Sequence, residues 1–266
     1  MQFVDTHTHL FSDQFEQDIQ QVVEESIKSC VTKFFIPHID SESTEAFYKL
    51  CHDFPDLMFP LMGVHPSSIN QDYKKELDHV FNQFDKVESL IPQKKFYGVG
   101  EIGIDLYWDK TFLKQQQDAF EQQLLFAKEK KLPIIIHARE SFNEIFEIVD
   151  KHNDENLSGI FHCFTGNLDQ AQKIIDFKNF KMGIGGVLTF KKSGLDKVVE
   201  QIDLNHLVLE TDSPYLAPTP YRGKRNQSNY IPIIAQKLAE VKGVSIETVA
   251  EVTTKNALEI FKMNEN

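Results

Sequence analysis

The chain has 266 residues, of which 41% are hydrophobic and 22 are phenylalanine, as expected for a globular protein with a sizeable core. No apolar run approaches the roughly 20 residues of a membrane helix, so we expect no membrane span. The 28 Lys and Arg against 40 Asp and Glu give a net charge of −12, which argues against long-range attraction of nucleic acid. Any phosphate partner must therefore be held locally.

The cysteines indicate a reducing compartment. Cys30, Cys51 and Cys163 are an odd, scattered set without a CxxC spacing, so we expect no disulfide framework and interpret each as a small buried residue. No basic and apolar signal segment opens the sequence. These features predict a cytoplasmic protein.

Strands and helices are expected to alternate along the chain, because short apolar runs are followed by segments with apolar residues at helical spacing. The expected strands are 3–10, 31–37, 57–64, 96–101, 132–137, 159–162, 180–184 and 207–212. The expected helices are 14–30, 41–53, 74–91, 113–131, 141–152, 168–178 and 193–203, and then 229–241 and 245–262. Eight units without a long linker predict an α/β protein, a (β/α)8 TIM barrel that forms a single domain over residues 1–266.

A doubly wound sheet is the alternative fold, because residues 98–103 match the GxGxxG pattern of dinucleotide-binding proteins. In that fold the motif opens a helix directly, whereas residues 104–109 intervene here before helical spacing resumes. We therefore interpret the match as accidental. The glutamines of segment 113–131 are expected on a solvated helix face.

Side chains of the kind that bind metals are expected at the ends of five strands. His7 and His9, two apart in an extended segment, would point to the same side. One such residue alone would be interpreted as a buried histidine or a solvated acid. In a barrel, however, the carboxyl ends of the strands surround one mouth, so the full set predicts a metal site. The six residues are His7, His9, Glu101, His137, His162 and Asp212.

Six ligands exceed one tetrahedral site and favour two divalent ions that share Glu101. His7, His9 and Asp212 would bind one ion, and His137 and His162 the other. A hydroxide bridging the ions would be the nucleophile, and the cationic centre would favour an anionic substrate such as a phosphodiester. The identity of the ions stays open among Mg²⁺, Zn²⁺ and Mn²⁺, and Ni²⁺ also suits imidazole ligands.

Several motifs give the chain a family resemblance. They are residues 5–9 (DTHTH), 63–66 (GVHP), 100–105 (GEIGID), 137–139 (HAR), 162–166 (HCFTG), 210–218 (ETDSPYLAP) and 222–226 (RGKRN). Together they resemble the TatD family of metal-dependent deoxyribonucleases, which belongs to the metal-dependent hydrolases with an amidohydrolase-like TIM barrel. The matching segments run through most of the chain, and as a set they are specific.

The resemblance implies that the six residues named above bind the metals and that His65 and Arg139 contact the substrate. Outside the family, His65 would be interpreted as a turn residue before Pro66, and Arg139 as a surface arginine. The chain departs from the family pattern around the 222–226 motif, where Tyr221 replaces a usual His and Gln227-Ser228-Asn229 replaces a usual Pro shortly afterwards. This departure concerns the fit of the substrate rather than the metal chemistry.

The leading hypothesis is an enzyme that cleaves DNA phosphodiester bonds, as a 3′–5′ exonuclease on single-stranded ends. Glu101 and Asp212 are its predicted catalytic residues, and Asp212 would act as both ligand and proton shuttle.

DNA is the expected partner, and no obligate protein partner is inferred. Arg222, Lys224 and Arg225 would hold phosphates locally, and Tyr107, Trp108 or Tyr221 could stack on bases. A solvated basic loop and packing at the barrel rim are equally good interpretations of these side chains.

Two alternatives stay open. The same site could hydrolyse a carboxylic ester or amide, such as a small molecule or an aminoacyl ester, because a fold does not determine a substrate. The chain could also be a metal-binding interaction protein without turnover.

Overall fold

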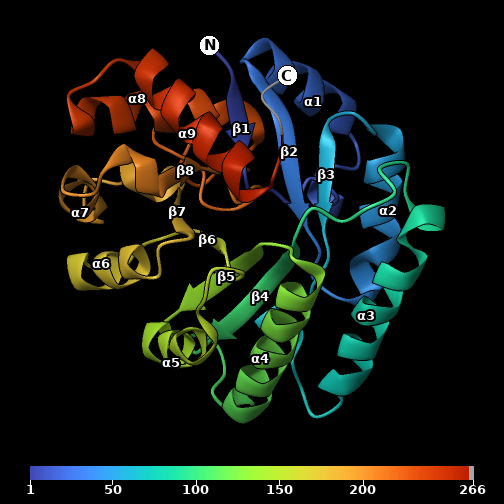
Figure 1. The fold of residues 1–266 in the computed structure, drawn as a ribbon. Coiled ribbons are helices and arrows are strands. Elements are labelled where there is room, and N and C mark those ends of the chain that lie inside the picture. The colour runs from blue at the N-terminus through green and yellow to red at the C-terminus, as the bar shows by residue number, and fades with distance from the viewer. Residues whose placement is uncertain (264–266) are drawn as a thin grey trace. The chain divides into compact units, whose positions relative to one another are not determined.

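The computed structural model describes residues 1–263, which form two compact units (Figure 1). The first unit comprises residues 1–35 and 162–266, of which 264–266 lie outside the described part, and the second comprises residues 36–161. Strand β2 (Val31–Pro37) runs from the first unit into the second. The prediction of a single domain over the whole chain stays a prediction.

The first unit carries a parallel arrangement of β1 (Phe3–Asp5), β2, β7 (Phe180–Ile184) and β8 (Leu207–Leu209). Strand β1 pairs with β2 and β7 pairs with β8, both in parallel. The N–H of Thr6 donates to the carbonyl of Leu209 (3.1 Å), which places β1 beside β8. The unit's α-helices are α1 (Ile19–Lys28), α6 (Leu168–Asp176), α7 (Leu195–Glu200), α8 (Ile231–Lys242) and α9 (Ile246–Ile260). Its 3₁₀ turns are η1 (Asp13–Phe15), η4 (Gly186–Thr189), η5 (Leu204–His206) and η6 (Ser228–Tyr230).

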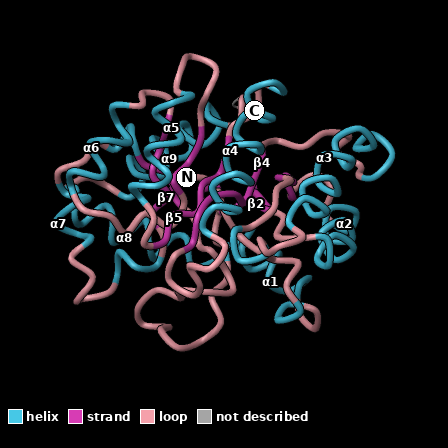
Figure 2. Tube along the Cα trace, turned by 90° about the horizontal axis from the view of Figure 1, so that it is seen from below, coloured by secondary structure: helices cyan, strands magenta, loops and turns pink. Residues whose placement is uncertain are grey.

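The second unit repeats this plan with β3 (Met58–Leu61), β4 (Val99–Asp105), β5 (Ile134–Arg139) and β6 (Gly159–Phe161). Strand β4 pairs with β5 and β5 with β6 in parallel, and Leu61 bridges to Gly98 beside β4. Its α-helices are α2 (Thr44–Asp53), α3 (Tyr73–Leu90), α4 (Leu113–Lys130) and α5 (Phe142–His152), and its 3₁₀ turns are η2 (Ser41–Ser43) and η3 (Pro66–Ser68). Helix α4 packs along β4 (Figure 2).

The predicted parallel α/β class is confirmed. Residues 1–263 contain eight strands in alternation with helices, in agreement with the (β/α)8 prediction. Every residue of β4 is buried, Glu101 and Asp105 included, as expected for a strand of a parallel sheet that is covered on both faces. The match at residues 98–103 lies mostly within β4, and the next helix begins only at Leu113. A dinucleotide motif is therefore absent from this position.

Several strand boundaries were predicted wrongly, among them that of β8, which ends at Leu209 rather than at Asp212. Strand β1 ends at Asp5, because the N–H groups of residues 6–9 donate to four separate partners instead of continuing one ladder. His7 and His9 therefore follow the strand rather than belonging to it. Strands β4 and β5 in turn extend beyond Glu101 and His137, to Asp105 and Arg139.

The prediction that the glutamines of α4 are solvated is wrong for two of them. Gln116 and Gln123 are buried on the helix face that meets the strands. The Oε1 of Gln116 accepts the N–H of Asp105 (2.8 Å), and the Oε1 of Gln123 accepts the N–H of Val64 (2.7 Å). Both side chains bind backbone N–H groups near the end of a strand, and these hydrogen bonds offset the loss of hydration when the amides are buried.

Gly103 lets β4 and β5 approach closely beside His137. It has a φ of +148°, and a Cβ at this position would lie 2.0 Å from the carbonyl oxygen of His137. We expect Gly103→Ala to lower the free energy of unfolding by about 1–3 kcal/mol, because the strands must separate to admit the methyl group. Urea unfolding measures this loss.

Gly185→Ala is the matched control, because a Cβ there would lie 3.6 Å from its nearest neighbour. Equal unfolding midpoints for the two variants would show that the approach at Gly103 is not tight.

Candidate metal centres

Three of the predicted ligands form a compact triangle in the first unit. The Nε2 atoms of His7 and His9 are 3.2 Å apart, and they lie 3.6 Å and 3.5 Å from Oδ1 of Asp212. Donor atoms around a tetrahedral ion with bonds of about 2.0–2.1 Å lie about 3.3 Å from one another. The three atoms therefore have the spacing and the chemistry of ligands to one divalent cation.

The backbone holds this triangle by joining the segment after β1 to the segment after β8. The N–H of Asp212 donates to the carbonyl of His7 (2.9 Å), and the N–H of His9 donates to the carbonyl of Ser213 (2.8 Å). Asp5 adds a side-chain link, since its carboxylate accepts the Thr211 N–H (2.9 Å) and the Thr211 hydroxyl (2.6 Å). Residues from the two ends of the sequence are thus fixed side by side.

Electrostatics favours the charged form of Asp212 and opposes that of Asp5. Burial alone would raise the pKa of Asp212, but a hydrogen bond with His9 and the charges of His162, His7 and His9 bring this pKa below its usual value. Burial raises the pKa of Asp5 to about 7 despite hydrogen bonds from Thr211 and Ser228. Asp212 is therefore the ionised carboxylate of the triangle, whereas burial opposes the charged form of Asp5.

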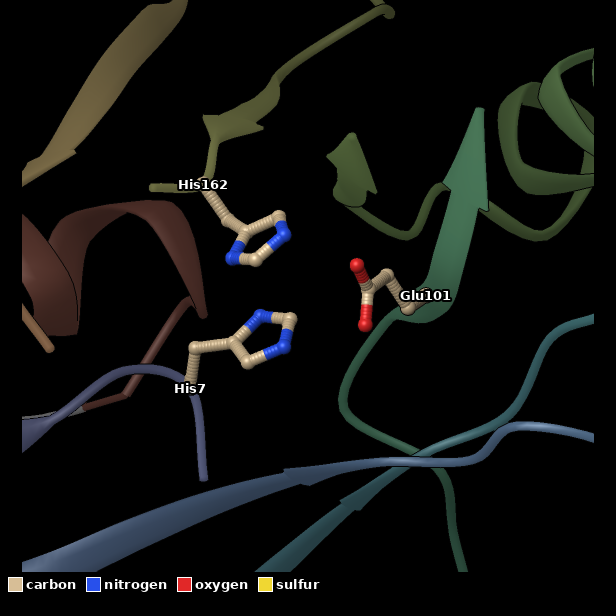
Figure 3. Close-up of side chains that lie close together, drawn as sticks. All are labelled: His7, Glu101 and His162. Carbon is tan, nitrogen blue, oxygen red and sulfur yellow. The ribbon is translucent and has the colours of Figure 1, made fainter. Parts of the chain in front are cut away.

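His162 also belongs to the first unit and stacks on His7. The two ring centroids are 3.8 Å apart with an angle of 12° between the planes (Figure 3). Its Nδ1 lies 3.5 Å from Oε1 of Glu210, a buried acid that the sequence analysis did not select. The predicted role of His162 as a ligand together with Glu101 and His137 stays a prediction.

A second group of imidazoles and a carboxylate lies in the second unit. Glu101 projects from β4 (Figure 3), and its Oε1 lies 2.8 Å from Nδ1 of His137 and 3.4 Å from Nε2 of His65. His65 and His137 are 3.3 Å apart through these same nitrogens. The group unites two predicted metal ligands with a residue that was predicted to contact substrate.

Hydrogen bonding assigns His65 the role of a donor in this group. Its Nδ1 accepts the N–H of Ser67 (3.1 Å) and lies 2.7 Å from the Ser67 hydroxyl. Because a neutral imidazole carries one proton, that proton must be on Nε2, the atom that faces Glu101. His65 therefore suits hydrogen bonding to a carboxylate or a substrate oxygen, and it does not suit metal ligation in this tautomer.

His137 lies between two carboxylates. Its Nε2 is 2.9 Å from Oδ2 of Asp105, while its Nδ1 faces Glu101. A neutral imidazole can donate to one of them only, so the arrangement suits either an imidazolium or a cation held by Nδ1 and Glu101. With Nε2–H donated to Asp105, the latter is the carboxylate–histidine–metal arrangement of many metal sites. The residues therefore fit a divalent ion.

Asp105 is the main residue that the sequence analysis missed. Burial alone would raise its pKa, but hydrogen bonds from His137 and the Tyr107 N–H and the charge of Arg139 bring it below the usual value. A signal was present, because Glu101 and Asp105 are four apart in one strand and so face the same side. The strand was predicted to end too early for this alternation to be seen.

The predicted substrate-binding residues have different surroundings. The Arg139 guanidinium lies 3.8 Å from the Tyr107 ring centroid, beside Asp105 in the register of β4 and β5. Arg222 lies over Phe190 (4.1 Å), and Lys224 lies near the Tyr221 ring (5.9 Å). All three cations keep exposed side chains.

Arg225, in contrast, forms a structural ion pair. Its two terminal nitrogens donate to the two oxygens of Asp18 (2.8 and 2.6 Å), and one of them also donates to the carbonyl of Gln14 (2.6 Å). The guanidinium is thus already engaged within the first unit, and its predicted contact with substrate stays a prediction.

Comparison with known proteins identifies the family. A model of the family described as TatD related DNase matches residues 4–262. The chain belongs to the TatD family. It is 33% identical over 261 residues to the uncharacterized metal-dependent hydrolase YabD of Bacillus subtilis, covering 98% of this chain and 99% of YabD. It is also 34% identical over 272 residues to a metal-dependent hydrolase of Buchnera aphidicola, covering 99% and 100%.

Solved TatD structures have the same fold. The crystal structure of the TatD homologue YjjV from Escherichia coli superposes with a TM-score of 0.88 at 25% identity, covering 98% of each chain. This TatD-family chain is therefore a metal-dependent hydrolase by family. In residues 1–263, every helix is either too short or too polar to cross a membrane.

The contact between Asp105 and His137 predicts an effect on metal affinity. We expect Asp105→Ala to weaken divalent-metal binding about 10- to 100-fold, because the carboxylate orients the imidazole and increases its basicity. Titration of chelator-stripped protein with Zn²⁺ or Mn²⁺ measures this affinity. Asp105→Asn, which keeps an acceptor oxygen, should lose less.

Asp109→Ala, in the loop that follows β4, is the matched control, because the Asp109 side chain hydrogen bonds within its own turn, to Thr111. An equal loss of affinity in the control and in Asp105→Ala would contradict the role of Asp105.

Proposed function

We propose that the chain is a divalent-metal-dependent deoxyribonuclease that removes nucleotides from single-stranded 3′ ends of DNA. The observation that carries the proposal is the triangle of His7, His9 and Asp212, whose donor atoms are spaced for one cation. Family membership supplies the substrate class, because the family is described as TatD related DNase. The relatives' own names say metal-dependent hydrolase and give no substrate.

We further propose that each chain binds two divalent ions, one at His7, His9 and Asp212 and one at Glu101 and His137. Bound ions would lower the pKa of a water molecule and stabilise negative charge on a phosphodiester. The predicted sharing of Glu101 and the ligation by His162 are extensions of this proposal.

The chain's own groups have separate tasks in this proposal. The Asp212 carboxylate, which is held in its ionised form, would accept the proton of the attacking water. The Nε2–H of His65 would donate to a non-bridging phosphate oxygen. Arg139, Arg222 and Lys224 would hold the phosphate backbone, which the body of a chain with a net charge of −12 cannot attract.

The test uses purified protein, stripped of metal and reloaded separately with Mg²⁺, Mn²⁺ or Zn²⁺, and a 5′-labelled single-stranded oligonucleotide. We expect metal-dependent shortening from the 3′ end. Asp212→Asn should slow it by about 100-fold or more, the scale on which a general base acts. Glu247→Gln, an isosteric change at an exposed acid of α9, is the matched control and should have no effect.

Other outcomes would decide between the hypotheses. Hydrolysis of carboxylic or aminoacyl esters without any degradation of DNA across the metal series would replace the nuclease with an esterase or amidase. Tight metal binding without turnover of either substrate class would favour a binding protein.

Elemental analysis tests the number of ions. We expect about two ions per chain, and a loss of about one in His9→Ala and of about one in His137→Ala, because the two residues lie in separate ligand groups. Full occupancy in both variants would contradict the proposed centres. The predicted cytoplasmic location and the predicted lack of an obligate protein partner stay predictions.

A further inference from the structure

Two large aromatic side chains stand in solvent directly after β4. Trp108 is 75% exposed and Tyr107 is 50% exposed. Their rings meet edge to face, with centroids 4.8 Å apart. Exposed neighbouring aromatic rings lose the free energy of burial, so they commonly mark a binding surface.

The guanidinium of Arg139 contacts both rings of the pair. The Arg139 guanidinium lies 3.8 Å from the Tyr107 centroid and 5.3 Å from the Trp108 centroid. It covers a face of the Tyr107 ring, whereas most of the indole surface stays in solvent. Trp108 is therefore the ring with an open face, and Tyr107 and Arg139 hold it in place.

The same three residues are tied to the candidate metal ligands of the second unit. The Tyr107 N–H donates to Oδ1 of Asp105 (2.9 Å), and the other oxygen of Asp105 contacts His137. Arg139 is two residues after His137 in β5 and pairs in register with Asp105. Asp105 thus connects Tyr107 directly to His137, a predicted metal ligand.

We propose that Trp108, supported by Tyr107 and Arg139, is a stacking subsite for the terminal nucleobase of a single-stranded DNA substrate. This inference rests on the proposed nuclease function and names the part of the substrate that the second unit recognises. The indole stacks on the base, and the guanidinium beside it contacts a phosphate of the same strand. Stacking accepts every base, because each has a π face, so the subsite favours an unpaired end over a particular sequence.

The cation argues for a nucleotide over other ligands that stack on indole. A neutral sugar ring or an apolar peptide segment carries no negative charge for the guanidinium beside the indole to pair with. A nucleotide brings an aromatic ring and a negative charge in one unit, and Arg binds phosphate and stacks on rings with equal ease. In a chain of net charge −12, such a local cation is what a phosphate requires.

The chain offers a direct optical test, because Trp108 is its single tryptophan. The experiment uses the full chain as Glu101→Gln, loaded with Mg²⁺, so that binding is followed without rapid cleavage. Two single-stranded oligonucleotides are compared, one natural and one with an abasic 3′-terminal residue. We expect the natural strand to quench tryptophan fluorescence and to bind about 10-fold more tightly, the effect of losing one stacked base.

Substitutions then locate the effect. In the Glu101→Gln background, measured by anisotropy of a 5′-labelled strand, Trp108→Ala should weaken binding of the natural strand about 10-fold and leave the abasic strand unchanged. Trp108→Phe keeps a ring and should restore most of the affinity. Leu125→Ala, at an exposed apolar residue of α4, is the control and should bind as the parent does.

The outcomes separate this inference from the nuclease proposal. Metal-dependent cleavage of DNA with equal affinity for both strands and no quenching would overturn the subsite and keep the nuclease. Quenching that depends on the terminal base, in a protein that degrades no DNA with any metal, would overturn the nuclease and keep the subsite. A chain that neither binds nor degrades DNA would overturn both.

Discussion

The carboxyl group of Asp5 is the link on which the first unit depends. It accepts both the N–H and the hydroxyl of Thr211, 206 positions away in the sequence, and so joins the first strand to the last. His7 and Asp212 lie immediately beyond this link and are joined by their own backbone hydrogen bond. A buried carboxyl in such a position is costly unless it is hydrogen bonded. Its hydrogen bonds therefore help to fix the place where the candidate ligands His7, His9 and Asp212 meet.

Side-chain amides bind the backbone N–H and C=O groups that lack a ladder partner at other strand ends. Gln116 and Gln123 accept backbone N–H groups beside β4 and after β3, and Asn226 donates to the carbonyls of Thr211 (2.7 Å) and Tyr215 (2.6 Å). Loops that carry functional residues leave backbone groups without a ladder, and buried groups must find partners. Long polar side chains from the surrounding helices and loops supply them. The rigidity of the ligand groups thus originates outside the ligands themselves.

Proton placement distinguishes histidines that look alike in sequence. Ser67 donates to His65, which leaves the other ring nitrogen as a donor. The carboxylate of Asp105 instead accepts a hydrogen bond from Nε2–H of His137, which leaves Nδ1 for a cation. Both residues face the same oxygen of Glu101. One group therefore contains both a hydrogen-bond donor and a nitrogen suited to a metal ion, so it could orient a substrate and stabilise negative charge.

The alternation of strands and helices, the parallel α/β class and the family could be predicted from the sequence alone, because apolar periodicity and short motifs are local properties. The sequence also placed His7 with His9 and Asp212, through the rule that the carboxyl ends of parallel strands converge. The sequence did not reveal that β4 continues to Asp105, that Arg225 pairs with Asp18, or that Trp108 contacts Tyr107 and Arg139. Each of these depends on which side chains meet across distant segments, and hydrogen-bond partners and ring contacts leave no periodic trace in the sequence.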